Sequence, residues 1–113
     1  LRVVLAGALS LALFAAPAAA TWTIVVVNTK TGEVAQGGAT CITTPNLKRI
    51  LAVVRVGHGV AAAQAVTDSG AVNRLVIWNG FIAGDSPQTI LDTLAVSDPN
   101  HPGRQYGIVD LFN

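Results

Sequence analysis

The order of apolar and polar residues predicts strands at the start of the chain. Residues 21–27 (TWTIVVV) are β-branched or aromatic almost throughout, which predicts a strand with both faces buried. The polar segment 28–32 ends in glycine and predicts a hairpin loop, from which residues 33–41 return as a second strand. Gly37 and Gly38 inside that strand indicate a bulge or the close approach of another backbone.

Further strands are predicted in the middle and at the end of the chain. Residues 47–51 fit a short helix or a turn. Residues 52–56 and 60–65 are predicted as strands on either side of Gly57-His58-Gly59. A last strand is predicted over residues 105–112.

Two helices are predicted between residues 69 and 97. Gly84 is expected to end the first in the left-handed conformation, and Ser86 and Pro87 fit the N-cap and the first position of the second. Apolar residues at helical spacing give the first helix the stripe Val72, Leu75, Trp78 and Ile82, flanked by Val76, and the second helix the face Ile90, Leu91 and Leu94. Strands followed by helices predict an α+β fold, with a sheet layer and a helix layer.

Composition adds a division of the chain at residue 20. Apolar residues make up 51% of the 113 residues, but residues 1–20 hold 16 of them and the other 93 residues hold 42. The second proportion is ordinary for a globular domain. The first 20 residues therefore require their own explanation.

Residues 1–20 have the three parts of a secretory signal peptide. Arg2 is the basic start, residues 3–14 are the apolar core, and Pro17 precedes the small residues Ala18 to Ala20. Cleavage after Ala20 would make Thr21 the first residue of the mature protein. The alternative is an uncleaved membrane anchor, for which the apolar stretch is only marginally long enough.

The charges and the single cysteine restrict the class of protein. The net charge of +1 comes from Arg2, because residues 21–113 carry six acidic and six basic side chains. Nucleic-acid binding through clustered Lys and Arg is therefore not expected. Cys41 has no partner for an internal disulfide, and we expect a small buried residue at a strand end; a partner in sequence outside this chain is the alternative.

An ordered set of short motifs runs through residues 21–113. The motifs are Thr21-Trp22-Thr23-Ile24-Val25, Thr31-Gly32-Glu33, Gly57-x-Gly59-Val60-Ala61-Ala62-Ala63-Gln64, Asn73, Gly84-x-Ser86, Asp98-Pro99 and Arg104-Gln105-x-Gly107-Ile108-Val109-Asp110. In this order they resemble the Ntn-hydrolase-like family catalogued as domain of unknown function 1028.

The resemblance implies an αββα sandwich of the Ntn-hydrolase type, in a domain about twice as long as this one. Residues 21–113 are therefore expected to be the N-terminal portion of that domain, after a signal peptide at residues 1–20. The segment Gln36-Gly37-Gly38 departs from the family, whose members usually alternate small apolar residues there. This departure leaves the geometry of the second strand open.

Thr21 is the candidate catalytic residue. In N-terminal nucleophile hydrolases the first residue attacks a carbonyl with its side chain and uses its own α-amine as the base. That amine has an ordinary pKa of about 7.7–8.0, so part of it is neutral near physiological pH. A cut after Ala20 would therefore both complete export and create the base. Alternatively, Thr21 is only a β-branched strand residue beside a cleavage site.

Gly57, Gly59 and Gln64 are candidate substrate-binding residues. The two glycines could present backbone N–H groups to an oxyanion, or they mark a tight turn. Gln64 could line the site, or it satisfies backbone groups in the sheet. Asp68 and Asp110, predicted at strand ends, could orient the Thr21 amine or belong to turns.

Two functions from different classes remain open. His58 and His101 lack the spacing of metal ligands, and we expect no metal or other cofactor. One hypothesis is a secreted amidohydrolase, periplasmic or extracellular, that hydrolyses a carbon–nitrogen bond in a small-molecule or peptide amide. The other is a non-catalytic secreted or cell-surface protein that uses the same fold for binding or assembly. A homo-oligomer fits both hypotheses, and neither involves nucleic acid, or a membrane after signal-peptide cleavage.

Overall fold

The computed structural model describes residues 21–43 and 46–113, and in them the chain forms five strands and three α-helices. The predicted signal peptide at residues 1–20 lies outside this part. The elements are β1 (Thr21–Asn28), β2 (Glu33–Thr40), α2 (Leu47–Ile50), β3 (Ala52–Arg55), β4 (Gly59–Ala65), α3 (Val72–Ala83), α4 (Pro87–Ser97), a 3₁₀ turn η1 (His101–Gly103) and β5 (Arg104–Asp110). The predicted order of strands and helices is confirmed, with bounds that differ by at most a few residues.

Strands β1 and β2 form a regular antiparallel hairpin. The Asn28 side chain accepts hydrogen bonds from the N–H groups of Lys30 and Thr31, and Gly32 closes the turn at φ +77°, where glycine is favoured. The register pairs residues one to one along the whole length, so β2 has no bulge. At Gly38 a Cβ would lie 3.0 Å from the Trp22 carbonyl oxygen, so a close approach of backbone explains this glycine.

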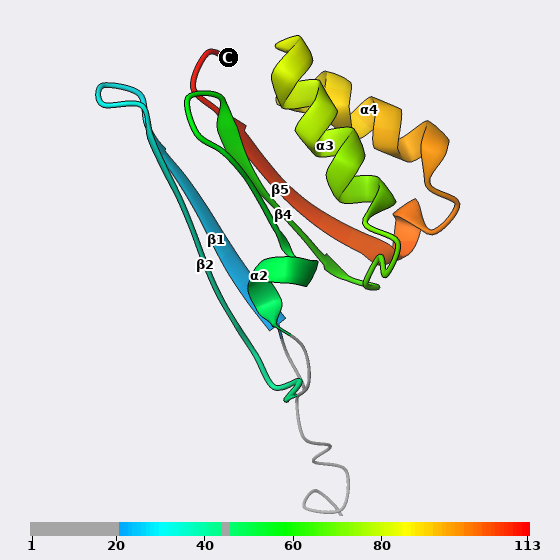
Figure 1. Ribbon diagram of the computed structural model, residues 1–113. Coiled ribbons are helices and arrows are strands. Elements are labelled where there is room, and N and C mark those ends of the chain that lie inside the picture. Colours follow the sequence, from blue (N-terminus) through cyan, green and yellow to red (C-terminus); the bar gives the residue numbers. More distant parts are fainter. Residues whose placement is uncertain (1–20, 44–45) are drawn as a thin grey trace, which may run out of the picture.

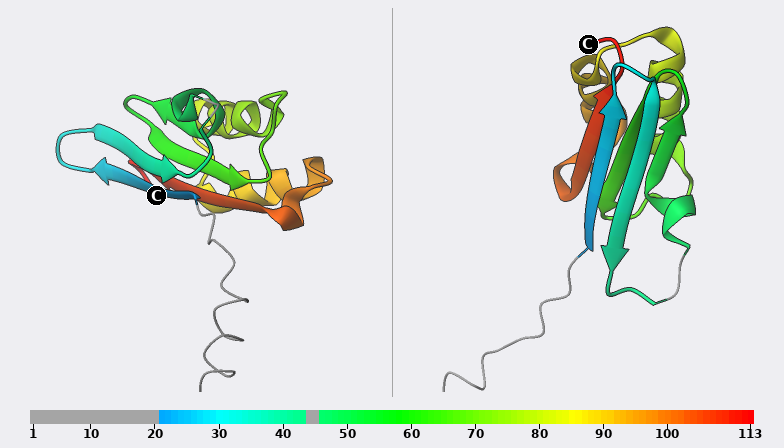
Figure 2. Two further views of the ribbon diagram at one scale, coloured as in Figure 1. Left: turned by 90° about the horizontal axis from the view of Figure 1, so that it is seen from below. Right: turned by 90° about the vertical axis from the view of Figure 1, so that its left-hand side faces the viewer.

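The protein has three layers, with the sheet β3–β4–β5 in the middle (Figure 1). The hairpin lies against one face of this antiparallel sheet, and α3 and α4 cover the other face, as both views in Figure 2 also show. The core on the helix side consists of Val53, Ala61, Ile77, Phe81, Ile90 and Leu94. The fold is therefore α+β, with two small antiparallel sheets.

The prediction that both faces of β1 are buried is wrong for the described part of the chain. Only the face toward the middle sheet is partly buried. On the other face Trp22, Ile24 and Val26 are 51–58% exposed. An unbroken apolar run shows that a strand can be covered on both sides, but it does not show that both covering layers are present.

The apolar stripe predicted for α3 is not the side that packs against the core, although Val76, which flanks it, does pack there. Val72, Leu75 and Ile82 are more than half exposed, and Trp78 is 36% exposed beneath the guanidinium of Arg55, 5.2 Å from the ring centroid. The residues that α3 does bury are Asn73, Ile77, Gly80 and Phe81. Helix α3 carries apolar residues on two sides, so periodicity could not decide between them.

Close packing of α3 against α4 determines which face of α3 is buried. A Cβ at Gly80 would lie 2.5 Å from Ile90 Cγ1, so this glycine lets the two helices approach. The predicted ends are confirmed: Gly84 has φ +78°, and the Ser86 hydroxyl accepts from the N–H of Thr89. Of the helices in residues 21–43 and 46–113, none has the length and apolar character needed to cross a membrane.

Two alanine substitutions in α3 test which side is buried. Ile77→Ala removes side-chain volume from the core and should lower the free energy of unfolding by roughly 2–5 kcal/mol. Leu75→Ala removes a similar volume from an exposed position and should change it by less than about 0.5 kcal/mol. Urea denaturation of both variants measures the difference. Equal losses would contradict the packing of α3.

Candidate functional site

The side chains between the two sheets change from polar to apolar along β1. At the Thr21 end it holds hydroxyl and amide side chains, and at the other end it holds valines. The polar members at the Thr21 end are Thr21, Thr23, Thr40, Gln64 and Gln105, and the apolar members at the far end are Val27, Val34, Val54, Val60 and Val109. Gln36, paired with Val25, lies between the two ends. On the facing sides of these described strands no residue is charged. The layer therefore has one neutral polar end, and Thr21 lies in it.

Thr21 and Thr40 are direct neighbours across the hairpin. They are paired in the register, and their Oγ1 atoms lie 2.7 Å apart. Thr40 also accepts a hydrogen bond from the N–H of Ile42 at 3.2 Å. Sequence reasoning did not single out Thr40, although the hairpin register places it opposite the first residue of β1.

Gln64 links the two sheets at this same end. Its Oε1 accepts from the hydroxyl of Thr23 at 3.1 Å, and its Nε2 donates to Oε1 of Gln105 at 2.9 Å. These contacts connect β1, β4 and β5 through side chains alone. Gln64 therefore contacts Thr23, which lies two residues after Thr21 on the same face of β1.

Gly57 and Gly59 lie at the opposite end of β4 from Gln64. Gly57 has φ +77° in the turn between β3 and β4. At Gly59 a Cβ would lie 2.6 Å from the Val109 carbonyl oxygen and 2.7 Å from Phe81 Cε1. One glycine serves the turn and the other leaves room for Phe81. The structure does not bring either glycine to Thr21.

Asp68 and Asp110 both serve local turns. Asp68 accepts from the N–H groups of Gly70 and Asn73 at the start of α3. Asp110 accepts from the N–H groups of Phe112 and Asn113, and it pairs with Gly59 at the far end of the sheet. The contacts of both aspartates therefore agree with the alternative that these residues belong to turns.

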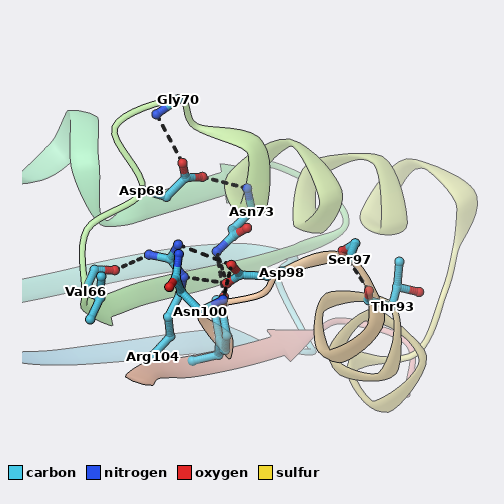
Figure 3. A network of polar contacts seen from close by, with 10 residues as sticks. Val66, Asp68, Gly70, Asn73, Thr93, Ser97, Asp98, Asn100 and Arg104 are labelled. Atoms are coloured by element: carbon cyan, nitrogen blue, oxygen red, sulfur yellow. Dashed lines mark hydrogen bonds and ion pairs between the residues drawn. The ribbon is translucent and has the colours of Figure 1, made fainter. Parts of the chain in front are cut away.

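A second polar network lies on the helix side of the middle sheet, at the same end as Thr21 (Figure 3). The buried carboxylate of Asp98 accepts from Arg104 Nε at 2.5 Å and from Asn73 Nδ2 at 2.8 Å. Tyr106 donates to the same carboxylate, and Arg104 also donates to the carbonyl of Val66. The network joins the ends of β4 and α4 to the starts of α3 and β5.

Charge and burial in this network shift three pKa values. The hydrogen bond from Arg104 holds the pKa of Asp98 well below its usual range, although burial acts the other way. The same hydrogen bond raises the pKa of Arg104. Burial, with the neighbouring Asp98, raises the pKa of Tyr106 to about 12. All three shifts favour the ion pair and the neutral phenol in the folded protein.

The two histidines are not among the polar residues around Thr21, whereas Cys41 directly follows Thr40, the partner of Thr21 in the hairpin. His58 is in the turn at the far end of β4, and the ring of His101 stacks on Tyr106 with centroids 5.6 Å apart. Among the residues described, no three His, Cys, Asp or Glu side chains are grouped to hold a metal ion. Cys41 is exposed, which corrects the expectation of a buried residue, because β2 ends at Thr40 and leaves Cys41 in the following loop.

Comparison with known protein families identifies the family of this chain. The profile of a family of unknown function (DUF1028) matches residues 21–113. The chain belongs to the DUF1028 family. No curated protein and no solved structure matches it.

Some of the motifs that suggested DUF1028 from the sequence meet in the two networks. Gln64 and Gln105 lie on the hairpin side of the middle sheet, and Asn73, Asp98 and Arg104 lie on its helix side. These residues are far apart in the sequence, and the spacing alone gave no sign that they touch. Part of the motif set therefore meets at one end of the middle sheet, whereas the motifs that contain Gly32, Gly57 and Gly84 lie in turns elsewhere.

The shifted pKa values predict how stability depends on pH. Because the pKa of Asp98 is lower in the folded state, its contribution is present above about pH 4 and is lost as pH falls below that. Because the pKa of Tyr106 is raised to about 12, its contribution is present below about pH 10 and is lost as pH rises toward 12.

Urea unfolding midpoints across this pH range measure both effects. Asp98→Asn should flatten the acidic limb, and Tyr106→Phe should flatten the alkaline limb. Asp92→Asn, on the exposed side of α4, is the matched control and should keep the wild-type acidic limb. An acidic limb unchanged in Asp98→Asn would contradict the role of the network.

Proposed function

We propose that this protein is a secreted Ntn-type amidohydrolase that uses Thr21 as nucleophile and base after signal-peptide cleavage. The observation that carries the proposal is the place of Thr21. It is the first residue of β1, and its hydroxyl lies between the two sheets within 2.7 Å of another hydroxyl. The predicted cut after Ala20 would give this same residue a free α-amine.

We further propose that the layers belong to an αββα sandwich of the Ntn-hydrolase type. The hairpin, the middle sheet and the pair α3–α4 correspond to the order β, β, α. In such a sandwich each sheet also carries helices on its outer side. The exposed apolar side chains of Trp22, Ile24 and Val26 on the outer face of the hairpin suit this arrangement.

The reaction would proceed in two steps. Thr21 Oγ1 forms a bond to the amide carbon while its hydroxyl proton passes to the Thr21 α-amine. The resulting ammonium returns a proton to the leaving nitrogen as the carbon–nitrogen bond breaks, which leaves an ester on Thr21. Water, deprotonated by the same amine, then hydrolyses the ester and restores the hydroxyl.

The neutral polar layer supports an amide that is uncharged near the scissile bond. Gln64 carries two N–H donors on Nε2, and Gln105 takes one of them. Within this proposal the other donor faces a substrate carbonyl, which makes Gln64 a substrate-binding residue. A charged group would find no opposite charge on the facing sides of the described strands.

A second candidate is a non-catalytic binding or assembly protein in the same secreted location. It is favoured by the exposed apolar stripe of α3, formed by Val72, Leu75 and Ile82. Homo-oligomer formation through such a face is compatible with either candidate.

Two measurements on the exported protein test the proposal. Intact-mass analysis should show Thr21 as the first residue. Phenylmethanesulfonyl fluoride should then sulfonylate Thr21 Oγ1, with a rate that rises through about pH 8 as the amine loses its proton. Peptide mapping locates the label. Thr21→Ala should abolish it, and Thr29→Val, an exposed threonine in the hairpin turn, should leave it unchanged.

The outcomes separate the candidates. Any first residue other than Thr21 contradicts the catalytic proposal, because a peptide-bonded threonine has no free amine. A mature protein that begins at Thr21 but is not labelled supports the binding or assembly candidate.

A further inference from the structure

We propose that Thr40 is a positioning residue that donates a hydrogen bond to Thr21 Oγ1 and so leaves the Thr21 proton free to pass to the α-amine. The inference rests on the proposed function of Thr21. It adds a residue that neither the sequence motifs nor the family match assigned.

The hairpin register fixes the pair. Thr21 and Thr40 lie directly opposite each other at the open end of β1 and β2, so their side chains are on the same face. Their Oγ1 atoms are 2.7 Å apart, the usual length of a bond between hydroxyls. Both residues are β-branched, which restricts their rotamers and keeps the two oxygens in place.

The direction of this hydrogen bond decides whether Thr21 can react. If Thr21 donates to Thr40, its proton points away from its own amine. If Thr40 donates, the Thr21 proton is available, and the alkoxide that develops at Oγ1 accepts a stronger hydrogen bond than the hydroxyl does. Only the second direction supports catalysis.

The backbone N–H of Ile42 favours the second direction. It donates to Thr40 Oγ1 at 3.2 Å, so Thr40 already accepts one hydrogen bond. A hydroxyl that accepts a bond becomes a better donor, and the chain from Ile42 N–H through Thr40 to Thr21 is aligned in one sense. The loop after β2 therefore sets the orientation of the nucleophile.

The test uses phenylmethanesulfonyl fluoride labelling of the exported protein, with variants at Thr40. Thr40→Val keeps the β-branched shape but removes the hydroxyl, and should slow labelling of Thr21 roughly two- to ten-fold, the equivalent of one neutral hydrogen bond. Thr40→Ser restores the hydroxyl and should restore the rate. Thr29→Val is the control for loss of a threonine hydroxyl elsewhere and should label at the wild-type rate.

A second variant leaves Thr40 intact. Ile42→Pro removes the N–H donor of an exposed residue, with φ of residue 42 also fixed by the ring, and it should also slow labelling, by less than Thr40→Val. Circular dichroism of each variant verifies folding, and if Thr40→Val does not fold, Ile42→Pro and Thr40→Ser decide the question.

The results distinguish this inference from the proposed function. Absence of labelling in the wild type overturns the function of Thr21. Labelling of the wild type with unchanged rates in Thr40→Val, or in Ile42→Pro where Thr40→Val does not fold, overturns only the role of Thr40. Slow labelling in Thr40→Ser, equal to that of Thr40→Val, would also overturn it, because the hydroxyl would then not be the cause.

Discussion

Burial of β4 on both faces is the constraint on which the rest of the structure depends. Residues 59–63 of this central strand are buried, and they are small: Gly59, Val60 and three alanines. Small side chains let the hairpin approach from one side and the helices from the other. Gly59 shows how tight this packing is, since a Cβ there would meet both the Val109 carbonyl oxygen and the Phe81 ring. The three-layer arrangement therefore depends on the small side chains of β4.

The same strand explains why polar residues gather at one end. The buried run stops at Gln64, near the end of β4, where amide groups can be paired. On β5, Arg104 and Gln105 are consecutive, so they project to opposite faces of the sheet. Arg104 joins the Asp98 network on the helix side, and Gln105 joins Gln64 on the hairpin side. The network that anchors the start of β5 therefore also helps to position Gln105, whose amide oxygen accepts from Gln64 on the hairpin side.

The fold could be predicted from the sequence where a local signal was unambiguous. The alternating turn and strand residues around Gly32, and the caps at Gly84 and Ser86, gave the correct elements because each signal has one physical meaning. The sequence was a poorer guide to which face of each element is buried. The two apolar sides of α3 are equivalent to a periodicity argument, and only the close contact of Gly80 with Ile90 selects one. Thr21 and Gln64 became candidate site residues because they lie in motifs, and the structure shows only that Gln64 contacts Thr23 on the strand that begins at Thr21. The contact between Thr21 and Thr40 and the contacts of the Asp98 network were not predicted, because they depend on pairings between distant segments.

The Thr23–Gln64 hydrogen bond joins the hairpin to the middle sheet at the end where Thr21 lies. A double-mutant cycle tests it most directly, with Thr23→Val, Gln64→Met and the double variant measured by urea unfolding. The bond predicts a coupling free energy of about 0.5–1.5 kcal/mol. A parallel cycle of Thr23→Val with Gln88→Met, on the exposed side of α4, should show additive effects. Additive effects for Thr23 and Gln64 as well would contradict the account.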